Sequence, residues 1–109
     1  MASTYKVLAQ SAPSATTNTD AYTVGSGKSA VVSTITVCNR SATAATYRIA
    51  IRPLGATIAN QHYVAYDATV AANDTISLTI GVTLAATDVV TVYASTANLS
   101  INLFGAEIA

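Results

Sequence analysis

The chain has 109 residues, a length that suits one domain with one hydrophobic core. Charged residues make up only 9% of it, and five basic and five acidic residues give a formal net charge of zero. This balance offers no basic footprint for a phosphate backbone and argues against nucleic-acid binding.

The apolar part of the sequence has the character of β-strands. Hydrophobic residues make up 51% of the chain, mostly as Ala, Val and Ile distributed among Thr and Ser, and β-branched residues suit a pleated, half-buried surface. A neutral surface rich in hydroxyl groups has little self-repulsion, so it tolerates close packing against copies of itself. Low charge can also be a general feature of small β domains that has no bearing on assembly, and composition leaves both interpretations open.

The sequence also bears on location. No apolar run approaches the roughly 18 residues that a transmembrane helix needs. Residues 1–6 lack the basic-then-apolar order of a signal peptide. We therefore expect a chain made in a cytoplasm, without a signal peptide and without a membrane partner.

The first third of the chain predicts three strands. Residues 4–8 form the first, and the Ser/Thr/Ala-rich residues 11–19 follow it as an extended arm or a crossing loop. Residues 21–24 form a short strand that leads into the glycine-containing residues 25–28, a predicted hairpin turn. Residues 29–38 are apolar on both sides in places, which is typical of a central strand.

The most regular pattern lies in residues 46–52. Apolar side chains alternate with polar or small ones from Tyr47 to Arg52, so one face of this strand belongs to the core and the other to solvent. Pro53 ends the strand because proline cannot donate to a ladder, and residues 54–56 turn the chain.

Four further strands are predicted at residues 62–67, 76–80, 89–94 and 99–103. In the first of them, Tyr63 and Tyr66 are expected on opposite faces, since side chains alternate along a strand. Two small-residue turns, residues 71–74 and 83–88, each carry an Asp before a strand.

These elements add up to about eight short antiparallel strands and no convincing helix. That pattern is typical of an all-β fold, a single β-sandwich or jelly-roll-like domain. We expect residues 1–19 to form the N-terminal strand with the arm or crossing loop, and residues 20–109 to form the sandwich. This whole N-terminal segment, residues 1 to about 19, is a candidate inter-subunit clasp, and the alternative is that it packs as an ordinary first strand on its own sheet.

The titratable groups are too few and too scattered to indicate catalysis. The chain has one histidine, His62, and one cysteine, Cys38, whereas acid–base chemistry needs groups that converge in a pocket. Cys38 lies at the end of an apolar strand without a local nucleophile signature, so a buried, inert thiol is expected rather than a Cys38/His62 pair. We predict no enzyme activity and assign no catalytic residue.

No metal or cofactor site is predicted either. Asp67, Asp74 and Asp88 could share a calcium ion on loops at one end of a sandwich, but they lack Asp-x-Asp spacing and are better explained as turn-forming residues. The segment from Gly25 to Ser29 looks superficially like a phosphate-binding loop, but its spacing fails and a strand follows it.

Six tyrosines make up most of the aromatic content, and the chain has no tryptophan. Tyrosine rings can stack against sugars, and β-sandwiches do host such sites. Here the tyrosines are dispersed singly among the predicted strands. Core edges and subunit interfaces are therefore the expected destinations, with a carbohydrate platform as the alternative.

Strand and turn strings recur along nearly the whole chain: YKVLAQ at residues 5–10, YTV at 22–24, VVSTITVCNR at 31–40, YRIAIRP at 47–53, AANDT at 71–75 and LFGAE at 103–107. Together they resemble small virion structural proteins of tailed bacteriophages, including those of cyanophage type. The resemblance implies a particle component present in many copies. It leaves open whether the protein decorates the head or belongs to the tail, neck or baseplate.

The leading hypothesis is therefore a non-enzymatic bacteriophage virion structural protein, either a capsid decoration or cement protein or a tail-, neck- or baseplate-associated component. Its expected partners are copies of itself and other virion proteins, since a small sandwich exposes edge strands that can pair across subunits. We expect a homo-oligomer located in the virion. The alternative is a receptor- or carbohydrate-binding module of a tail fibre, which needs Tyr and Asp side chains clustered in one set of loops.

Overall fold

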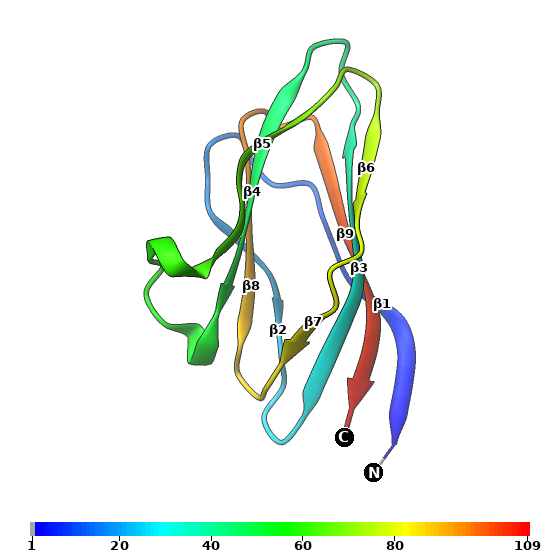
Figure 1. Ribbon diagram of the computed structural model, residues 1–109, viewed down its shortest axis with the longest axis vertical. Helices are drawn as coiled ribbons and strands as arrows, with labels where there is room; N and C mark the ends of the chain where they lie inside the picture. The colour runs from blue at the N-terminus through cyan, green and yellow to red at the C-terminus, as the bar shows by residue number, and fades with distance from the viewer. Residues whose placement is uncertain (1) are drawn as a thin grey trace.

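The computed structural model describes residues 2–109, which form nine antiparallel strands in two sheets packed face to face (Figure 1). The prediction of an all-β sandwich is confirmed. The body measures 45 × 28 × 20 Å along its principal axes. Among these residues, no helix has the length and apolar character that crossing a membrane requires.

Within the described residues, sheet A contains five strands. β1 (Ser3–Ser11) lies at one edge and pairs with β9 (Leu99–Ile108), which in turn pairs with β3 (Ser29–Asn39). The other side of β3 pairs with two short strands, β6 (Thr75–Leu78) and β7 (Val82–Leu84). β3 is thus a central strand, as its two-sided apolar sequence predicts.

Sheet B holds the four remaining strands of residues 2–109, namely β2 (Thr19–Thr23), β8 (Val89–Ala94), β4 (Ala45–Arg52) and β5 (Tyr63–Val70), paired in that order. Because β1 lies beside β9 and β2 beside β8, the two ends of the chain run side by side, which is the pairing order of a jelly roll. The two ends of the chain therefore meet at one end of the body (Figure 1), where the Ala109 N–H donates to the Ala2 carbonyl at 3.0 Å.

The core lies between the sheets and is built from alternate residues of their inner faces. Ile35 and Val37 of β3 meet Ile49 of β4 and Val92 of β8 in one buried cluster. Burying such a side chain contributes roughly 1.5–3 kcal/mol relative to leaving it exposed. The period-two pattern of the sequence therefore sets which side of each strand faces inward.

A β-bulge in β3 keeps its core residues in phase. Val32 and Ile35 are three positions apart, so strict alternation would put them on opposite faces, yet both are buried. The register with β9 shifts between Val32 and Thr34, and the extra residue, Ser33, returns both side chains to the core.

Gly105 of β9 lies beside this bulge. A Cβ atom on residue 105 would collide with the Val31 carbonyl group of β3. The close approach of the two backbones therefore requires glycine at this position, as is common where a strand passes a bulge.

Asn39 closes the end of the sandwich that is remote from the termini. Its side chain is 1% exposed. The Nδ2 group donates to the carbonyls of Thr43 at 2.8 Å and Ala71 at 3.2 Å, and Oδ1 accepts the Ser41 N–H at 3.0 Å. One buried amide thus ties the end of β3 to the loop after it and to the segment after β5, and buried polar groups are stable only when they are paired in this way.

The connection from β4 to β5 covers part of the outward side of sheet B. β4 ends at Arg52 as predicted, and Pro53 begins the 3-10 turn η1 (Pro53–Gly55), which is followed by η2 (Asn60–His62). Figure 1 shows both turns on the side of sheet B that faces away from sheet A. The Leu54 N–H donates to Asp88 Oδ1 at 2.9 Å and anchors this connection.

Two sequence-based assignments are wrong. Residues 83–88 are predicted as a turn, whereas Thr83 and Leu84 belong to β7, a strand too short to show a period-two pattern. Residues 25–28 are predicted as a hairpin turn, whereas they connect β2 of sheet B to β3 of sheet A. The tight turn itself exists, since the Lys28 N–H donates to the Gly25 carbonyl at 3.1 Å, but the strands it joins do not pair.

Candidate functional site

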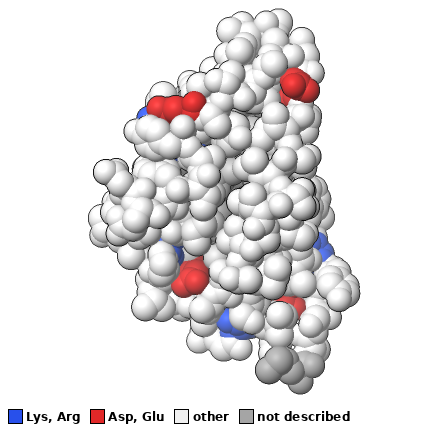
Figure 2. Space-filling model, in the orientation of Figure 1, with Lys and Arg blue, Asp and Glu red and all other residues white. Residues whose placement is uncertain are grey.

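The two outward faces of the sandwich differ in chemistry. Among the described residues, the strand register of sheet A places only uncharged side chains on its outward face, including Tyr5, Val7, Val31, Thr36, Ser77, Asn102, Phe104 and Ala106. The outward face of sheet B carries two arginines and two aspartates. Figure 2 shows how few charged groups interrupt the surface on the side that it displays.

A group of aromatic and charged side chains, which we call the Arg48 cluster, stands on the outward face of sheet B. It consists of Arg48, Asp67, Tyr63, Tyr66 and Tyr93. The Arg48 guanidinium carbon lies 4.3 Å from the ring centre of Tyr66 and 4.2 Å from that of Tyr93. Arg48 Nε donates to Asp67 Oδ1 at 2.7 Å, and Nη2 donates to Oδ2 at 3.3 Å. The guanidinium is therefore held by two rings and one carboxylate, a geometry that suits a planar cation.

A bulge in β5 builds the Arg48 cluster. Tyr47 pairs with Ala68 and Ile49 pairs with Ala65, so two residues of β5 oppose the single residue Arg48. Asp67, in this bulge, has a φ of 50°, a left-handed conformation that is uncommon outside glycine. Bulges of this kind re-aim side chains, and here Asp67 is directed at Arg48.

A second register shift in β5 makes one sequence-based prediction wrong. Tyr63 and Tyr66 are expected on opposite faces, but their ring centres lie 4.8 Å apart with an interplanar angle of 85°. The register with β4 shifts a second time between Ile49, which pairs with Ala65, and Ala50, which pairs with Tyr63, so both rings reach the outward face. Edge-to-face packing of this type stabilises the arrangement.

The Arg48 cluster presents a partly exposed surface. Tyr66 is 57% exposed, and the Asp67 side chain is 45% exposed. The hydrogen bonds from Arg48 to Asp67 hold the pKa of the guanidinium above its ordinary value, so Arg48 stays a cation. The cluster offers an aromatic face and charged hydrogen-bonding groups in fixed positions, and tyrosine and arginine are the residue types that dominate binding energy in interfaces.

A second hydrogen-bond network on sheet B, around Arg52, holds parts of the fold together. Arg52 Nη1 donates to Asp20 Oδ1 at 2.8 Å and to Thr91 Oγ1 at 3.1 Å, and the Thr91 hydroxyl donates to Asp20 Oδ1 at 2.9 Å. Arg52 Nη2 also donates to the Gly55 carbonyl at 3.0 Å. These bonds fasten η1 and β2 to the middle of the sheet.

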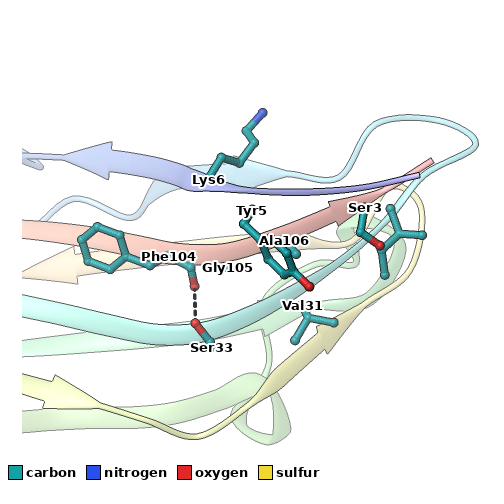
Figure 3. A pocket seen from close by; sticks show the side chains of 9 residues that line it. Ser3, Tyr5, Lys6, Val31, Ser33, Phe104, Gly105 and Ala106 are labelled. Carbon is teal, nitrogen blue, oxygen red and sulfur yellow. Dashed lines mark hydrogen bonds between the residues drawn. The ribbon is translucent and has the colours of Figure 1, made fainter. Parts of the chain in front are cut away.

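Sheet A carries an apolar hollow at its end near the chain termini, and we call this hollow the Tyr5 face. It consists of Tyr5, Val31, Phe104, Ala106 and Ile108, and serines lie at its rim. Figure 3 shows Tyr5, Val31, Phe104 and Ala106 on neighbouring strands, with Lys6 pointing away from them. Tyr5 is 86% exposed and the neighbouring Val7 is 47% exposed. The Tyr5 face is thus an apolar surface beside the edge strand β1.

An ionic group links the two sheets next to the termini. Glu107 Oε1 accepts from Lys6 Nζ at 3.0 Å, and Oε2 accepts the Tyr22 hydroxyl at 2.6 Å. Lys6 and Glu107 belong to sheet A, and Tyr22 belongs to sheet B. The hydrogen bond from Tyr22, followed by that from Lys6, lowers the pKa of Glu107, while burial and the Glu107 contact raise the pKa of Tyr22.

The residues weighed for catalysis come from different layers. Cys38 is half-buried on β3 in sheet A. His62 belongs to η2, which contacts β4 of sheet B, and its Nδ1 accepts the Ala59 N–H at 3.0 Å. Cys38 is thus half-buried, whereas a buried thiol is expected from the sequence, and the structure does not bring the two side chains together.

The three aspartates weighed for calcium have separate roles. Asp74 Oδ1 accepts the N–H of Thr75 at 2.8 Å, and Asp88 accepts N–H groups of two loops. Asp67 departs from the turn interpretation because it pairs with Arg48. Among residues 2–109, no three His, Cys, Asp or Glu side chains gather as metal ligands do.

The tyrosines are less dispersed than the sequence indicates. Tyr63, Tyr66 and Tyr93 meet in the Arg48 cluster, whereas Tyr47 lies in the core and Tyr5 is exposed on sheet A. The sequence carries no signal for the cluster, because it depends on a bulge and on the pairing of β4 with both β5 and β8. A comparison with protein-family models, curated proteins and solved structures found no match to this chain.

Proposed function

We propose that the chain is a non-enzymatic structural subunit of a bacteriophage particle and acts through contacts between subunits. The observation that carries the proposal is the Tyr5 face. An apolar hollow beside an unpaired strand edge is a surface that a particle component can bury against a neighbour. Contiguous exposed apolar patches on soluble proteins commonly mark interaction sites.

The chemistry of sheet A suits a packed environment. Its outward side chains, within the described part of the chain, are hydroxyl, amide or apolar groups. No charge has to be desolvated when a neighbour covers this face, and desolvation of charge is the main cost of burying polar surfaces. Burial of apolar area contributes roughly 25 cal/mol per Å², so contact free energy can accumulate over a shallow surface.

The fold and the resemblance support the proposal to different degrees. Jelly rolls occur in viral capsid domains and in lectins, so the fold is compatible with both candidate functions by analogy alone. The resemblance to virion structural proteins of tailed bacteriophages favours a particle component. A head decoration or cement protein and a tail, neck or baseplate component are both within the proposal.

The test is cryo-electron microscopy of particles from the phage that encodes the chain, with the chain traced in the map. We expect many symmetry-related copies, each with sheet A against a neighbour. Copies on the head lattice would assign a decoration or cement role, and copies confined to the tail or neck would assign a tail role. Infectious particles that lack the chain, as judged by mass spectrometry, would contradict the proposal.

A second candidate function, recognition of a receptor or a carbohydrate, is favoured by the Arg48 cluster. Tyrosine rings stack against sugar rings, and a guanidinium with a carboxylate can hydrogen-bond to sugar hydroxyls. The Tyr and Asp side chains that this function needs lie together, although on strands rather than in one set of loops.

A glycan array separates the two functions. Under the second candidate, the wild-type chain binds a defined glycan, Tyr66→Ala loses the signal, and Tyr5→Ala on the opposite sheet retains it. An array without a specific signal, or a signal that Tyr66→Ala leaves unchanged, counts against recognition through the Arg48 cluster.

A further inference from the structure

β1 is an edge strand whose outer side is open. β9 pairs with one side of it, and within residues 2–109 no strand pairs with the other. All five residues from Ser3 to Val7 are exposed. Beyond Ser11 the chain crosses to sheet B, where Ala15 bridges Ala94, so the crossing segment leaves residues 3–7 uncovered (Figure 1).

Two hydrogen bonds fix the direction of the backbone groups in this region. The Ala109 N–H donates to the Ala2 carbonyl, so the backbone of Ala2 faces the end of β9. The Ser33 hydroxyl donates to the Phe104 carbonyl at 3.1 Å, so the backbone of Phe104 faces β3 and not β1. Both observations agree with the strict alternation of an antiparallel ladder.

The alternation shows which residues of β1 direct their backbone groups toward β9 and which direct them to the open edge. Thr4 and Lys6 pair with Glu107 and Gly105, and their N–H and C=O groups point at β9. The N–H and C=O groups of Ser3, Tyr5 and Val7 therefore point away from the molecule. Unpaired groups of this kind are a template for another strand.

The geometry points to a second copy of this chain as the strand that fills the open edge: two β1 strands pair antiparallel about a two-fold axis at Tyr5. The inference rests on the proposed function in that it names the partner in the subunit contact. A two-fold contact is self-complementary, so the same three residues supply donors and acceptors on both sides.

The register follows from the positions of the free groups. With the axis at Tyr5, Ser3 lies opposite Val7 of the partner subunit, and each opposed pair exchanges two hydrogen bonds. An axis at Thr4 would leave Val7 beyond the end of the partner strand, because β1 begins at Ser3. An axis at Lys6 would set Ser3 opposite Ala9 of the partner strand, which lies beyond the bulge between Val7 and Ala9.

The side chains of β1 favour the same contact. Lys6 is bound to Glu107 of its own chain at 3.0 Å, so the only charge of the segment is neutralised within each copy. Edge strands that avoid pairing carry proline, a bulge or unpaired lysines, whereas residues 3–7 precede the bulge between Val7 and Ala9 and contain no proline. Pairing also brings the two Tyr5 faces together into one continuous apolar surface.

Cysteine cross-linking in a Cys38→Ala background tests the register. In the proposed dimer the Cα atoms of two opposed residues at position 5 are about 5.5 Å apart, which a disulfide can span. The two residues at position 7 are four positions apart along the ladder, roughly 13 Å, which it cannot. We expect Tyr5→Cys to form a disulfide dimer on mild oxidation at least tenfold faster than Val7→Cys. A mixture of Ser3→Cys and Val7→Cys chains should form the mixed dimer.

Equal cross-linking rates at positions 5 and 7, or no cross-linking at position 5, overturn the inference. A second measurement does not depend on disulfides. Tyr5→Pro removes an N–H that faces the open edge and leaves the β1–β9 ladder intact, so sedimentation equilibrium should show a wild-type dimer and a folded, monomeric variant. A wild-type chain that is monomeric up to millimolar concentration also overturns the inference.

The outcomes separate this inference from the proposed function. A chain that cross-links at Tyr5 but is missing from infectious particles contradicts the particle role and leaves the dimer standing. A chain found in particles without β1–β1 contacts, and monomeric in solution, contradicts the dimer and leaves the particle role standing.

Discussion

The outward faces of the two sheets differ in which groups they expose to solvent. On the outward face of sheet B, the charged side chains are paired within the chain, since Arg48 binds Asp67 and Arg52 binds Asp20. On sheet A, the outward side chains of the described residues are uncharged, and Tyr5 and Val7 stand in solvent beside an open strand edge.

This difference indicates that sheet B contributes mainly to the stability of one chain and the edge of sheet A mainly to contacts between molecules. The outward face of sheet B pairs its charged side chains within the chain, so covering that face leaves few groups to satisfy apart from the exposed rings of the Arg48 cluster. Sheet A has free backbone groups and apolar area that only another molecule can bury. We therefore expect substitutions on sheet B to change the folding of one chain, and substitutions at the edge of sheet A to change its contacts.

The largest expected effect comes from the point where β9 crosses the bulge of β3. In Gly105→Ala the new methyl group collides with the Val31 carbonyl, and a backbone atom cannot move aside as a side chain can. We expect a loss of about 3 kcal/mol in the free energy of unfolding, the upper part of the usual range for overpacking. Urea denaturation measures it.

Gly25→Ala is the matched control for this substitution. A Cβ at residue 25 meets Lys28 Cδ at 3.5 Å, an ordinary contact with a flexible side chain. Its effect should stay within about 0.5 kcal/mol. Similar urea midpoints for the two variants would show that the close approach of β9 and β3 is not rigid.

A smaller loss is expected where one side chain joins the ends of the two sheets. Asn39→Ala removes the amide that donates to the carbonyls of Val70, in the core, and Ala71 and that accepts the Ser41 N–H. We expect a loss of about 2 kcal/mol, since unpaired buried polar groups keep their desolvation penalty. Asn102→Ala, on the outward face of sheet A, is the control and should change stability by less than about 0.5 kcal/mol. Equal effects of the two variants would contradict the role of Asn39.

A direct comparison of the two outward faces uses one substitution on each. Thr91→Val removes the hydroxyl that joins Arg52 to Asp20 on sheet B, and we expect a loss of about 1 kcal/mol. Thr36→Val on the outward face of sheet A keeps a β-branched side chain and should be neutral within about 0.5 kcal/mol. Thermal unfolding of both variants measures the contrast. A Thr36→Val loss as large as that of Thr91→Val would mean that sheet A also depends on its outward hydroxyl groups.

The sequence predicts the sandwich because its strongest signals are local. The alternation from Tyr47 to Arg52 and the stop at Pro53 both appear in the structure, since a half-buried strand needs period two and proline ends the ladder. The three-residue strand β7 escapes prediction because its pairing with β3 defines it rather than its own composition.

The candidate surfaces are harder to predict than the fold. The Arg48 cluster depends on a bulge at Asp67, where no glycine marks the positive φ. The Tyr5 face depends on β1 being an edge strand, and a strand sequence does not state which neighbours it lacks. Both features arise from long-range pairing, and period-two patterns carry no information about it.

The smallest predicted effect concerns the link between the sheets near the termini, and it depends on pH. The Tyr22 hydroxyl and the Lys6 ammonium hold the pKa of Glu107 below its ordinary value. Glu107 therefore contributes stability that is fully present above the unfolded pKa of about 4.3 and is lost as the pH falls through the lower folded value. Glu107→Gln lacks this contribution at every pH.

Urea denaturation from pH 7 to pH 2 should thus give two curves that converge in acid. Near neutral pH the wild-type chain is the more stable, and the difference shrinks below about pH 4.3 because the unfolded wild type takes up a proton before the folded one does. Lys28→Gln is the control, since Lys28 acts on Glu107 only by a weak electrostatic attraction, and it should leave the shape of the acid limb unchanged. A constant difference in stability between wild type and Glu107→Gln across the whole pH range would mean that the charge of the carboxylate makes no contribution to stability. The two sheets would then be joined at this end by the Tyr22 hydrogen bond, with no contribution from charge.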